Sequence, residues 1–374
     1  MKIMMSAGEA SGDVHGAGLA REMKRLCPSV ELFGLGGALM EAAGVRLVRD
    51  YKDYNVMGVV EVVRNLRRIL RLLDDLTEIM RRERPDLLVL IDYPDFNWRL
   101  AKRAKKLGVK VLSYIPPSAW AWRKGRAKDC AAVADEFVAI FPFELPVYEA
   151  AGAKIFFLGN PLVDTVKPTM TADEARKFFG VAADDCVVLL MPGSRRQEIK
   201  LLLPPMLNAA KILSTVRPMK FFLPVADGVD SSNLRRQIEA AGVEIILTDS
   251  ARRYDLMQIA DAAAATSGTV VLESALMNLP CVVLYKMAPL NFLIGKLLVD
   301  IKFFSLPNIL AGEKILTELL QSQVTPERIA DEILQLLDNR AVVVKKLQAA
   351  CAKLGEPGAA FRVAKKILET AETR

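Results

Sequence analysis

Residues 1–13 read MKIMMSAGEASGD, a short apolar run that ends abruptly in a stretch of small residues. This pattern predicts a first strand that delivers a loop, with Glu9 and Asp13 near its two ends, to the mouth of an α/β domain. Ligands of open α/β sheets bind at the carboxyl ends of the strands, so chemistry is expected here. Asp13 can also cap a helix that begins near Val14, whose free amide groups favour an anionic ligand. A tight turn with a capped helix and no ligand explains the stretch equally well when it is taken alone.

Length and composition favour a soluble protein with two domains. The chain has 374 residues, of which 52% are apolar and 25% charged, so it can form two cores and is not expected to be disordered. Its five cysteines include no close pair, as expected for reduced thiols in a cytosolic protein. We expect no signal peptide and no membrane span, because residues 1–13 lack a long apolar stretch and the apolar region 262–285 is interrupted by polar residues.

The chain contains a single histidine, His15. A Ser-His-Asp triad must use this residue or not exist, and a histidine-rich metal site is excluded. The absence of an Asp-x-Asp pair argues against a dedicated metal clamp for a nucleotide diphosphate. We therefore expect no metal, no cofactor and a general base that is a carboxylate, His15 or a lysine. The first candidates are Glu9, Asp13, Asp92 and Asp95.

The net charge of +7 and the pI near 9.1 suggest an anionic partner. Four basic clusters, at residues 64–71, 81–84, 102–106 and 123–128, lie in the first third of the chain. Solvated helix faces account for most such clusters, but this grouping favours one basic domain that faces a membrane surface or phosphates. Nucleic acid is less favoured, because no recognised nucleic-acid module is present.

Two segments have the composition of membrane-contacting surfaces. Residues 62–73 carry apolar side chains at helical spacing among arginines, as in an interfacial helix, although an ordinary amphipathic helix fits at least as well. Residues 289–304 are more apolar than a surface loop and suit a core segment, a dimer interface or a lipid-facing surface. The residues of the first segment expected at a membrane are Leu66, Arg67, Arg68, Leu70 and Arg71.

Apolar strands alternate with helical patterns in both halves of the chain, which predicts buried parallel sheets. Expected strands are residues 2–6, 31–35, 87–91, 110–113 and 136–140, and then 187–191, 220–224, 244–247, 262–266 and 281–285. Expected helices include residues 14–26, 57–84, 99–107 and 202–216. The pattern predicts an α/β protein of two lobes, 1–162 and 163–340, with a cleft between them. Helices in residues 341–374 are expected to pack back onto the first lobe or onto a partner chain.

A first loop of the second lobe has the composition of a phosphate-binding turn. Gly193, Ser194 and Arg195 join an expected strand to a helix. The backbone amides of such a turn and an arginine beside it suit a phosphate. A capped helix with a surface arginine is the alternative.

A second loop repeats this arrangement with Ser267, Gly268 and Thr269. Ser267 and Thr269 can cap the helix that follows, and its open amides suit a diphosphate. Glu273 comes one helical turn later, where it can accept hydrogen bonds from a ribose diol. Two such loops on one lobe predict a nucleotide site, most simply for a nucleoside diphosphate.

The first lobe has its own candidates after an expected buried strand. Asp92 closes that strand and is expected to face the cleft, whereas Asp95 and Asn97 enter the next helix, where a cap and a turn residue are the alternatives. Trp120 and Trp122 lie in a proline-rigidified loop that can line a sugar or acyl site, or belong to the core.

Taken together, these stretches resemble the lipid-A-disaccharide synthase family over essentially the whole chain. The matching stretches include GEASGD (8–13), IDYPDFN (91–97), PSAWAW (117–122), PFE (142–144), PGSRRQEI (192–199), SGTVVLE (267–273), LPNILAG (306–312) and ELLQ (318–321). The family is similar to the two-lobed GT-B glycosyltransferases, whose lobes are Rossmann-like and whose nucleotide sugar binds the second lobe.

The resemblance implies an inverting transfer from UDP-2,3-diacylglucosamine to 2,3-diacylglucosamine 1-phosphate (lipid X), which yields lipid A disaccharide 1-phosphate and UDP. It implies that Asp92 is the base and that Glu9 is its rival or orients the acceptor. The acceptor side would comprise Ser11, Asp13, Asp95, Asn97, Trp120 and Trp122. The donor side would comprise Gly193, Ser194, Arg195, Ser267, Gly268, Thr269, Glu273, Asn308 and Gln321.

Acyl chains on both substrates would explain the basic and apolar patches, so the resemblance implies a peripheral protein on the cytoplasmic face of the inner membrane. Relatives also imply a homodimer, which no residue pattern establishes. Two alternatives stay open: a UDP-N-acetylglucosamine 2-epimerase or other GT-B transferase, and a non-catalytic membrane adaptor that binds a nucleotide sugar. The combination of Glu9, Asp92 and Arg195 argues against the adaptor.

Overall fold

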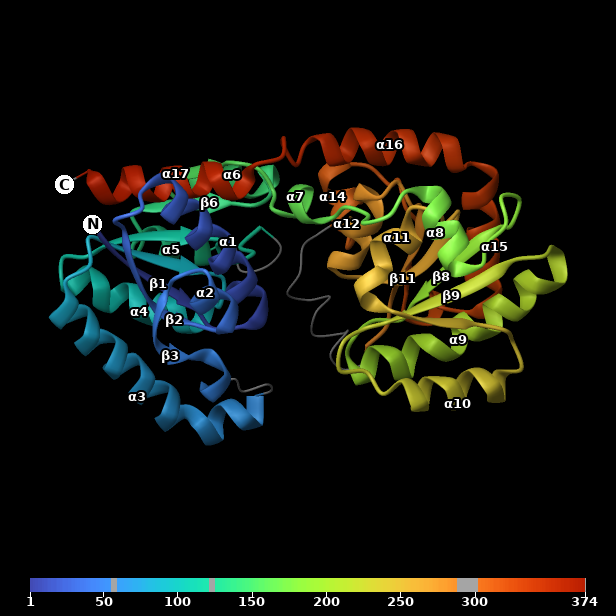
Figure 1. The fold of residues 1–374 in the computed structure, drawn as a ribbon, viewed down its shortest axis with the longest axis horizontal. Coiled ribbons are helices and arrows are strands. Elements are labelled where there is room, and N and C mark those ends of the chain that lie inside the picture. Colours follow the sequence, from blue (N-terminus) through green and yellow to red (C-terminus); the bar gives the residue numbers. More distant parts are fainter. Residues whose placement is uncertain (55–58, 121–124, 288–301, 374) are drawn as a thin grey trace. The chain divides into compact units, whose positions relative to one another are not determined.

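The computed structural model describes residues 1–54, 59–120, 125–287 and 302–373, with the side chains of residues 59–66 outside the description. The chain divides into two compact units (Figure 1). Unit 1 contains Met1–Val163 and Leu354–Arg374, and unit 2 contains Asp164–Lys353. Helix α16 (Arg340–Ala352) belongs to unit 2, so the chain returns to unit 1 later than the expected residue 341, with helix α17 (Ala359–Glu372).

Unit 1 is built on a seven-stranded sheet with the order β3-β2-β1-β4-β5-β6-β7. All neighbouring strands run parallel, as the buried apolar runs predict. The strands are β1 (Lys2–Ala7), β2 (Glu31–Gly36), β3 (Arg46–Asp50), β4 (Leu87–Ile91), β5 (Lys110–Tyr114), β6 (Glu136–Ala139) and β7 (Ile155–Phe157).

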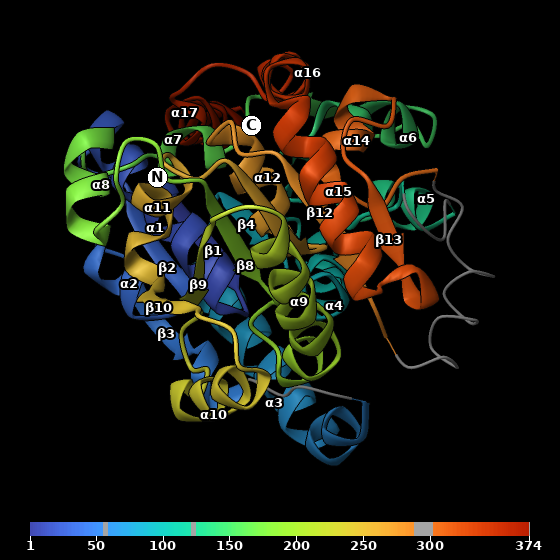
Figure 2. The same cartoon turned by 90° about the vertical axis from the view of Figure 1, so that its right-hand side faces the viewer.

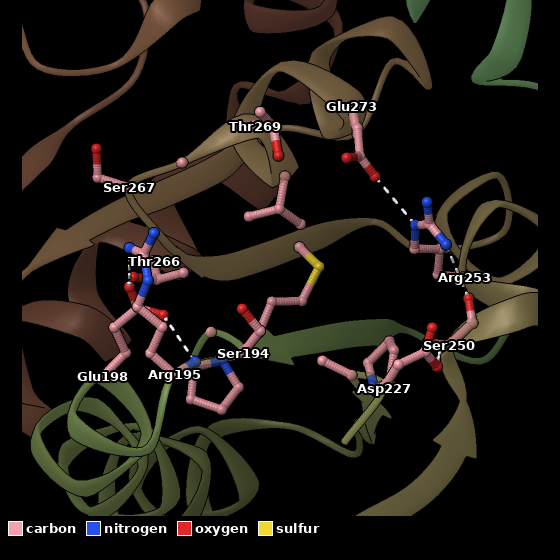
Figure 3. Close-up of a pocket in the computed structure, with 17 residues that line it drawn as sticks. Ser194, Arg195, Glu198, Asp227, Ser250, Arg253, Thr266, Ser267, Thr269 and Glu273 are labelled. Carbon is pink, nitrogen blue, oxygen red and sulfur yellow. Dashed lines mark hydrogen bonds and ion pairs between the residues drawn. The ribbon is translucent and has the colours of Figure 1, made fainter. Parts of the chain in front are cut away.

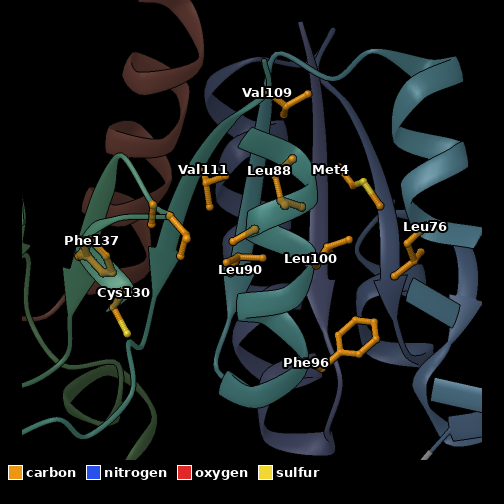
Figure 4. Close-up of a cluster of buried hydrophobic side chains, with 14 of the residues drawn as sticks. Met4, Leu76, Leu88, Leu90, Phe96, Leu100, Val109, Val111, Cys130 and Phe137 are labelled. Atoms are coloured by element: carbon orange, nitrogen blue, oxygen red, sulfur yellow. The ribbon is translucent and has the colours of Figure 1, made fainter. Parts of the chain in front are cut away.

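Helices cover both faces of this sheet because its central strands are buried on both faces. On one face, Met4 and Leu88 pack with Leu100 of α4 and Leu76 of α3 (Figure 4). On the opposite face, residues of β1 and β4 share a core with α1 and α17. The helices of unit 1 are α1 (Ala10–Leu26), α2 (Ala38–Ala42), α3 (Val59–Glu83), α4 (Pro94–Lys106), α5 (Arg126–Ala131) and α6 (Leu145–Glu149), with α7 (Leu162–Thr165) at the unit boundary.

A buried carboxylate fastens helix α17 to the sheet. Glu136 on β6 accepts a hydrogen bond from Thr370 Oγ1 at 2.6 Å and pairs with Lys366 Nζ at 2.8 Å, both from α17. Lys154 Nζ lies 2.5 Å from the other carboxylate oxygen. These partners hold the pKa of Glu136 below its ordinary value although burial alone would raise it.

Unit 2 is built on a six-stranded sheet with the order β10-β9-β8-β11-β12-β13, again with all neighbours parallel. The strands are β8 (Val187–Met191), β9 (Lys220–Val225), β10 (Ile246–Asp249), β11 (Ala262–Thr266), β12 (Cys281–Tyr285) and β13 (Glu318–Leu320). The helices besides α16 are α8 (Ala172–Phe179), α9 (Arg196–Val216), α10 (Ser231–Ala241), α11 (Arg253–Met257), α12 (Thr269–Leu276), α14 (Leu306–Ala311) and α15 (Pro326–Asp338), as Figure 2 shows from a second side.

Helix α9 is the core helix of unit 2. Within the described residues it is the one helix long and apolar enough, by length and composition, to cross a membrane, and 44% of that stretch is buried in the protein. It packs against α15 and the sheet through Leu202, Leu203 and Met206. Burial against its own unit therefore accounts for its apolar composition.

The expected cap of the first helix is wrong. Helix α1 begins at Ala10 rather than near Val14, so Asp13 lies inside its first turn. The Asp13 carboxylate instead accepts hydrogen bonds from the amides of Gly37, Leu39 and Met40, at 2.9, 3.1 and 3.0 Å. Asp13 thus caps the start of α2, because a buried helix terminus needs partners for its free amides.

Three strands were not expected from the sequence: β3, β7 and β13. Each lies at or near an edge of its sheet, and β7 and β13 have only three residues. Half-buried edge strands lack the continuous apolar run by which central strands are recognised. The central strands β1, β4, β8 and β11 occur where the sequence predicts them.

We expect Asp13→Ala to lower the free energy of unfolding in urea by at least about 2 kcal/mol, because two buried amides and one part-buried amide lose a charged partner. Asp53→Ala, at an exposed carboxylate of the same unit, should change it by less than about 0.5 kcal/mol. A stable Asp13→Ala protein that has lost activity would instead assign Asp13 to the substrate.

Candidate active site

In each unit the strand order reverses at one point, and the predicted site residues follow the strands that flank it. The reversal lies between β1 and β4 in unit 1, and between β8 and β11 in unit 2. Glu9 and Asp92 follow β1 and β4, and Ser194 and Ser267 follow β8 and β11. Parallel sheets bind their ligands at such points, outside the carboxyl ends of the strands.

Unit 2 has a cavity of about 520 Å³ at its reversal point (Figure 3). It is bordered by the ends of β8, β9 and β11 and by the starts of α9 and α12. Its lining includes six of the predicted donor-side residues: Gly193, Ser194, Arg195, Ser267, Gly268 and Thr269. Glu273, the seventh, lines it as well.

The first turn of α12 borders this cavity, and among the described residues no acceptor contacts the amides of Gly268, Thr269 and Val270, whereas the Val271 amide donates to the Gly268 carbonyl oxygen at 3.2 Å. Its N-cap residue Gly268 has no side chain, and no side-chain cap is formed. The expectation that Ser267 and Thr269 cap the helix is therefore wrong; Ser267 Oγ instead approaches the carbonyl oxygen of Phe304 at 3.5 Å. A helix start with unfilled amides favours an anion.

The start of α9 differs, because a carboxylate of the protein already lies there. Glu198 accepts hydrogen bonds from the Arg195 amide at 3.2 Å and from Arg195 Nη1 at 3.0 Å. Gly193 has φ +112°, and a Cβ on it would overlap the Glu198 carboxylate. The amides expected to face a phosphate are thus partly satisfied internally, while the Arg195 side chain is 83% exposed at the rim of the cavity.

Glu273 is held by two side chains that the sequence analysis did not single out. Its Oε2 atom accepts hydrogen bonds from Arg253 Nε at 3.0 Å and Tyr254 Oη at 3.1 Å. Burial, together with the neighbouring Glu273 carboxylate, raises the pKa of Tyr254 to about 12. The phenol therefore stays protonated and donates a hydrogen bond to Glu273.

Asn308 and Gln321 do not line the described part of this cavity. Asn308 is fully buried. Its Nδ2 atom donates to the Leu316 carbonyl oxygen and, at 2.9 Å, to Glu318, and its Oδ1 atom accepts from the amides of Ile315 and Leu316. Gln321 Oε1 accepts from the Met287 amide at 3.2 Å. Within the described residues both side chains therefore support loops of unit 2.

In unit 1, Asp92 lies in a strained loop at the end of β4. Asp92 and Tyr93 have φ of 49° and 52°, a left-handed conformation that side chains other than glycine rarely adopt. Burial raises the pKa of Asp92, although a hydrogen bond from the Tyr93 backbone opposes the shift. Strain of this kind persists only where the surroundings impose it, and it clusters at functional sites.

Asn97 imposes that conformation rather than acting as a turn residue. It is buried in helix α4, and its Nδ2 atom donates to the carbonyl oxygens of Asp92 at 2.6 Å and Ser6 at 3.3 Å. Ser6 Oγ donates to Asn97 Oδ1 at 2.7 Å. One amide thus ties the end of β1 to the loop that carries Asp92.

The two candidate catalytic carboxylates come from neighbouring strand ends. Ala7 and Ile91 are paired residues of β1 and β4, and the chain reaches Glu9 and Asp92 within two residues of this pair. Tyr93 covers Gly8 so closely that a Cβ there would overlap its ring. Glu9 is exposed, and its charge contributes to the raised pKa of Tyr93, whose main cause is burial.

The remaining acceptor-side candidates are spread over this edge of unit 1. Asp95 is not the cap of α4, whose N-cap is Tyr93; it pairs with Arg126 at 2.6 Å. Trp120 meets the Phe143 ring edge-on at 4.8 Å between centroids, and Ser11 is exposed in the first turn of α1. Trp122 lies outside the described residues.

Two further titratable side chains of unit 1 have pKa values shifted by burial. Burial lowers the pKa of His15, whose ring meets that of Tyr114 edge-on. Burial raises the pKa of Glu144, in the 3-10 turn 142–144 after β6, to about 7, and the Phe141 amide donates to its carboxylate at 3.1 Å. Among the described residues, no group of three or more His, Cys, Asp and Glu side chains is arranged to hold a metal ion.

Comparison with known proteins decides the family. The profile of the family described as LpxB, lipid-A-disaccharide synthetase, matches residues 3–367. The lipid-A-disaccharide synthase of Geobacter metallireducens is 44% identical over 98% of this chain and 97% of that relative. This chain belongs to the lipid-A-disaccharide synthase family.

Members of the lipid-A-disaccharide synthase family are glycosyltransferases of lipid A biosynthesis, which is the class of this enzyme. Solved structures support the GT-B-like fold. A putative UDP-N-acetylglucosamine 2-epimerase from Listeria monocytogenes has a TM-score of 0.69 and 18% identity, covering 100% of this chain and 97% of that one. MurG from Acinetobacter baumannii has a TM-score of 0.62 and 17% identity, covering 98% and 99%.

These likenesses are to the fold alone, so the epimerase alternative has no support beyond shared architecture. The stretches that resemble the lipid-A-disaccharide synthase family instead fall on the two reversal points. GEASGD and IDYPDFN form the loops after β1 and β4, and PGSRRQEI and SGTVVLE form those after β8 and β11. The family resemblance and the position expected for ligands therefore coincide.

Proposed function

We propose that this enzyme joins UDP-2,3-diacylglucosamine to 2,3-diacylglucosamine 1-phosphate (lipid X) through a β-1,6 linkage and releases UDP. The observation that carries the proposal is the family match, which spans residues 3–367 and so includes the loops of both units. The cavity of unit 2, with its open helix start, supports a nucleotide as one substrate.

In this proposal the UDP portion of the donor binds the unit 2 cavity. The amides at the start of α12, where Ser267, Gly268 and Thr269 lie, donate hydrogen bonds to the diphosphate, and the helix dipole stabilises the charge that develops as UDP departs. Arg195, at the rim, adds a guanidinium that turns from Glu198 to the phosphate. Glu273 accepts hydrogen bonds from the ribose diol.

Asp92 is the proposed general base for the acceptor. The donor is α-linked and the product β-linked, so the acceptor's 6-hydroxyl oxygen attacks the anomeric carbon as the bond to UDP breaks. The hydroxyl proton passes to the Asp92 carboxylate, and the electron pair of the broken bond leaves with UDP. The strained loop and the raised pKa of Asp92 support this role over that of exposed Glu9, which orients the acceptor.

We also propose that unit 1 binds the anionic cytoplasmic face of the inner membrane through helix α3, and that two chains form a dimer. Arg67, Arg68 and Arg71 are exposed on α3, and Leu70 is 38% exposed among them. Leu66, the fifth residue of the expected patch, has a side chain outside the description. Exposed arginines beside apolar side chains suit an anionic lipid surface.

The reaction is tested by the release of UDP from purified enzyme supplied with UDP-2,3-diacylglucosamine in EDTA, with and without lipid X. We expect release that depends on lipid X, because direct displacement needs the acceptor hydroxyl. Equal release without the acceptor would indicate hydrolysis or another reaction. Release that requires added magnesium would contradict the metal-independent departure of UDP.

We expect Asp92→Asn to lower kcat at least ~100-fold, since the amide cannot accept the proton. Its affinity for UDP should stay within about twofold, because the proposed UDP contacts lie in unit 2. In the wild type, the acid limb of kcat/KM should lie above the ordinary aspartate pKa of about 3.9 and reflect Asp92.

Asp129→Asn, at an exposed carboxylate of unit 1, is the matched control and should keep normal turnover. Near-normal turnover of Asp92→Asn together with a loss in Glu9→Gln would move the base to Glu9.

We expect the triple variant Arg67→Glu, Arg68→Glu and Arg71→Glu to bind anionic liposomes less than wild type, with the difference greatest at low salt. The matched control reverses three exposed charges of unit 2, at Arg235, Arg236 and Lys345. Equal cosedimentation of wild type and the α3 variant would make α3 an ordinary surface helix.

A further inference from the structure

Arg253 and Tyr254 at the start of α11 form a closed hydrogen-bonded group with Glu273 on α12. Arg253 Nε donates to Glu273 Oε2 at 3.0 Å, and Arg253 Nη2 lies 2.8 Å from Tyr254 Oη. Tyr254 Oη lies 3.1 Å from the same Glu273 oxygen. The three side chains belong to two helices and enclose no other group.

The direction of each hydrogen bond in this group follows from chemistry. A guanidinium only donates, so the Tyr254 oxygen accepts from Arg253 and its proton is directed to Glu273. Glu273 Oε2 therefore receives two donors. No hydrogen bond among the described residues engages Oε1, and Glu273 lines the cavity.

Arg253 is itself anchored away from the start of α12. Its Nη1 atom donates to the carbonyl oxygen of Ser250 at 3.2 Å, and its guanidinium lies 4.3 Å from the centroid of the Tyr254 ring. Arg253 and Arg195 lie on opposite sides of the cavity in Figure 3, with Ser267 on the side of Arg195. Each guanidinium nitrogen of Arg253 already donates one hydrogen bond, and these three bonds hold the side chain against Glu273, Ser250 and Tyr254.

We propose that Arg253 and Tyr254 are positioning residues that fix Glu273 so that its Oε1 atom accepts hydrogen bonds from the ribose hydroxyls of a nucleoside diphosphate. This inference rests on the proposed binding of UDP in the unit 2 cavity. It explains how the site would select a ribose. A freely rotating carboxylate would lose conformational entropy on binding the diol, whereas the Glu273 carboxylate is already oriented.

In this role Arg253 and Tyr254 affect only the contact with the ribose hydroxyls. If they orient Glu273, their loss weakens binding of UDP but leaves unchanged the binding of a nucleotide that lacks both ribose hydroxyls. If Arg253 binds phosphate or base, or if it merely supports the fold, both nucleotides lose affinity together. The ratio of the two dissociation constants separates these cases.

The experiment is calorimetric titration of the full-length enzyme with UDP and with 2′,3′-dideoxy-UDP. For wild type we expect UDP to bind at least ~10-fold more tightly, the scale of a hydrogen bond to a charged group. Tyr254→Phe and Arg253→Lys should each lower this ratio at least ~3-fold, while the affinity for 2′,3′-dideoxy-UDP stays within about twofold. Glu273→Gln gives the reference for loss of the ribose contact.

Arg252→Lys is the matched control, because the Arg252 guanidinium bonds to Thr169 Oγ1 at 2.8 Å and does not line the described cavity. An unchanged ratio in both Tyr254→Phe and Arg253→Lys overturns the inference. Equal weakening of both nucleotides does so as well. If the wild-type enzyme binds the two nucleotides equally, the ribose contact and this inference are overturned while UDP binding stands. If it binds neither nucleotide, the proposed UDP site itself is overturned. Two variants at different residues keep the test decisive if one of them fails to fold.

Discussion

Where a buried parallel strand runs directly into a helix, the last carbonyl groups of the strand and the first amides of the helix meet at the edge of the sheet and need partners. At three helix starts an acidic side chain of the protein supplies partners for the amides. Asp13 serves the start of α2, Glu198 that of α9 and Asp230 that of α10. By contrast, α1, α4 and α12 begin without a side-chain cap. These three helices follow β1, β4 and β11, which flank the reversals of strand order.

The uncapped helix starts and the strained backbone both lie next to the reversals of strand order. The left-handed conformation at Asp92 and Tyr93 costs free energy, which the surroundings offset through the buried Asn97 and its bonds to two strand ends. In unit 2, the Arg253 and Tyr254 pair plays a comparable part for Glu273. In unit 1 the partner holds the backbone of the candidate residue, and in unit 2 the partners hold the Glu273 carboxylate itself.

Much of this arrangement is predictable from local patterns. The continuous apolar runs locate β1, β4, β8 and β11, and the small residues after them locate the loops at both reversals. What local patterns miss are partners that are distant in the chain: the bonds of Asp13 to residues 37–40, and of Arg253 to Glu273. The spacing of Arg195 and Glu198 is that of the N-cap and N3 positions in a capping box, so the position of the Glu198 carboxylate at this helix start can be predicted locally. Asn308 is predicted on the donor side, and its bonds to backbone groups seven and eight residues away are a structural role that the local pattern does not reveal.

The return of α17 to unit 1 also bears on how the chain folds during its synthesis. Val363, Ala364 and Ile367 of α17 share a core with Ile3, Val89 and Leu112 of the first sheet. Helix α1 covers part of that face early, but the part over β4 and β5 that α17 contacts is not covered until α17 has left the ribosome, after all of unit 2 has been made. Unit 2 is a single continuous stretch and can close its core earlier, since domains fold as units as they emerge. The part of the protein that is translated first is therefore the part that is completed last.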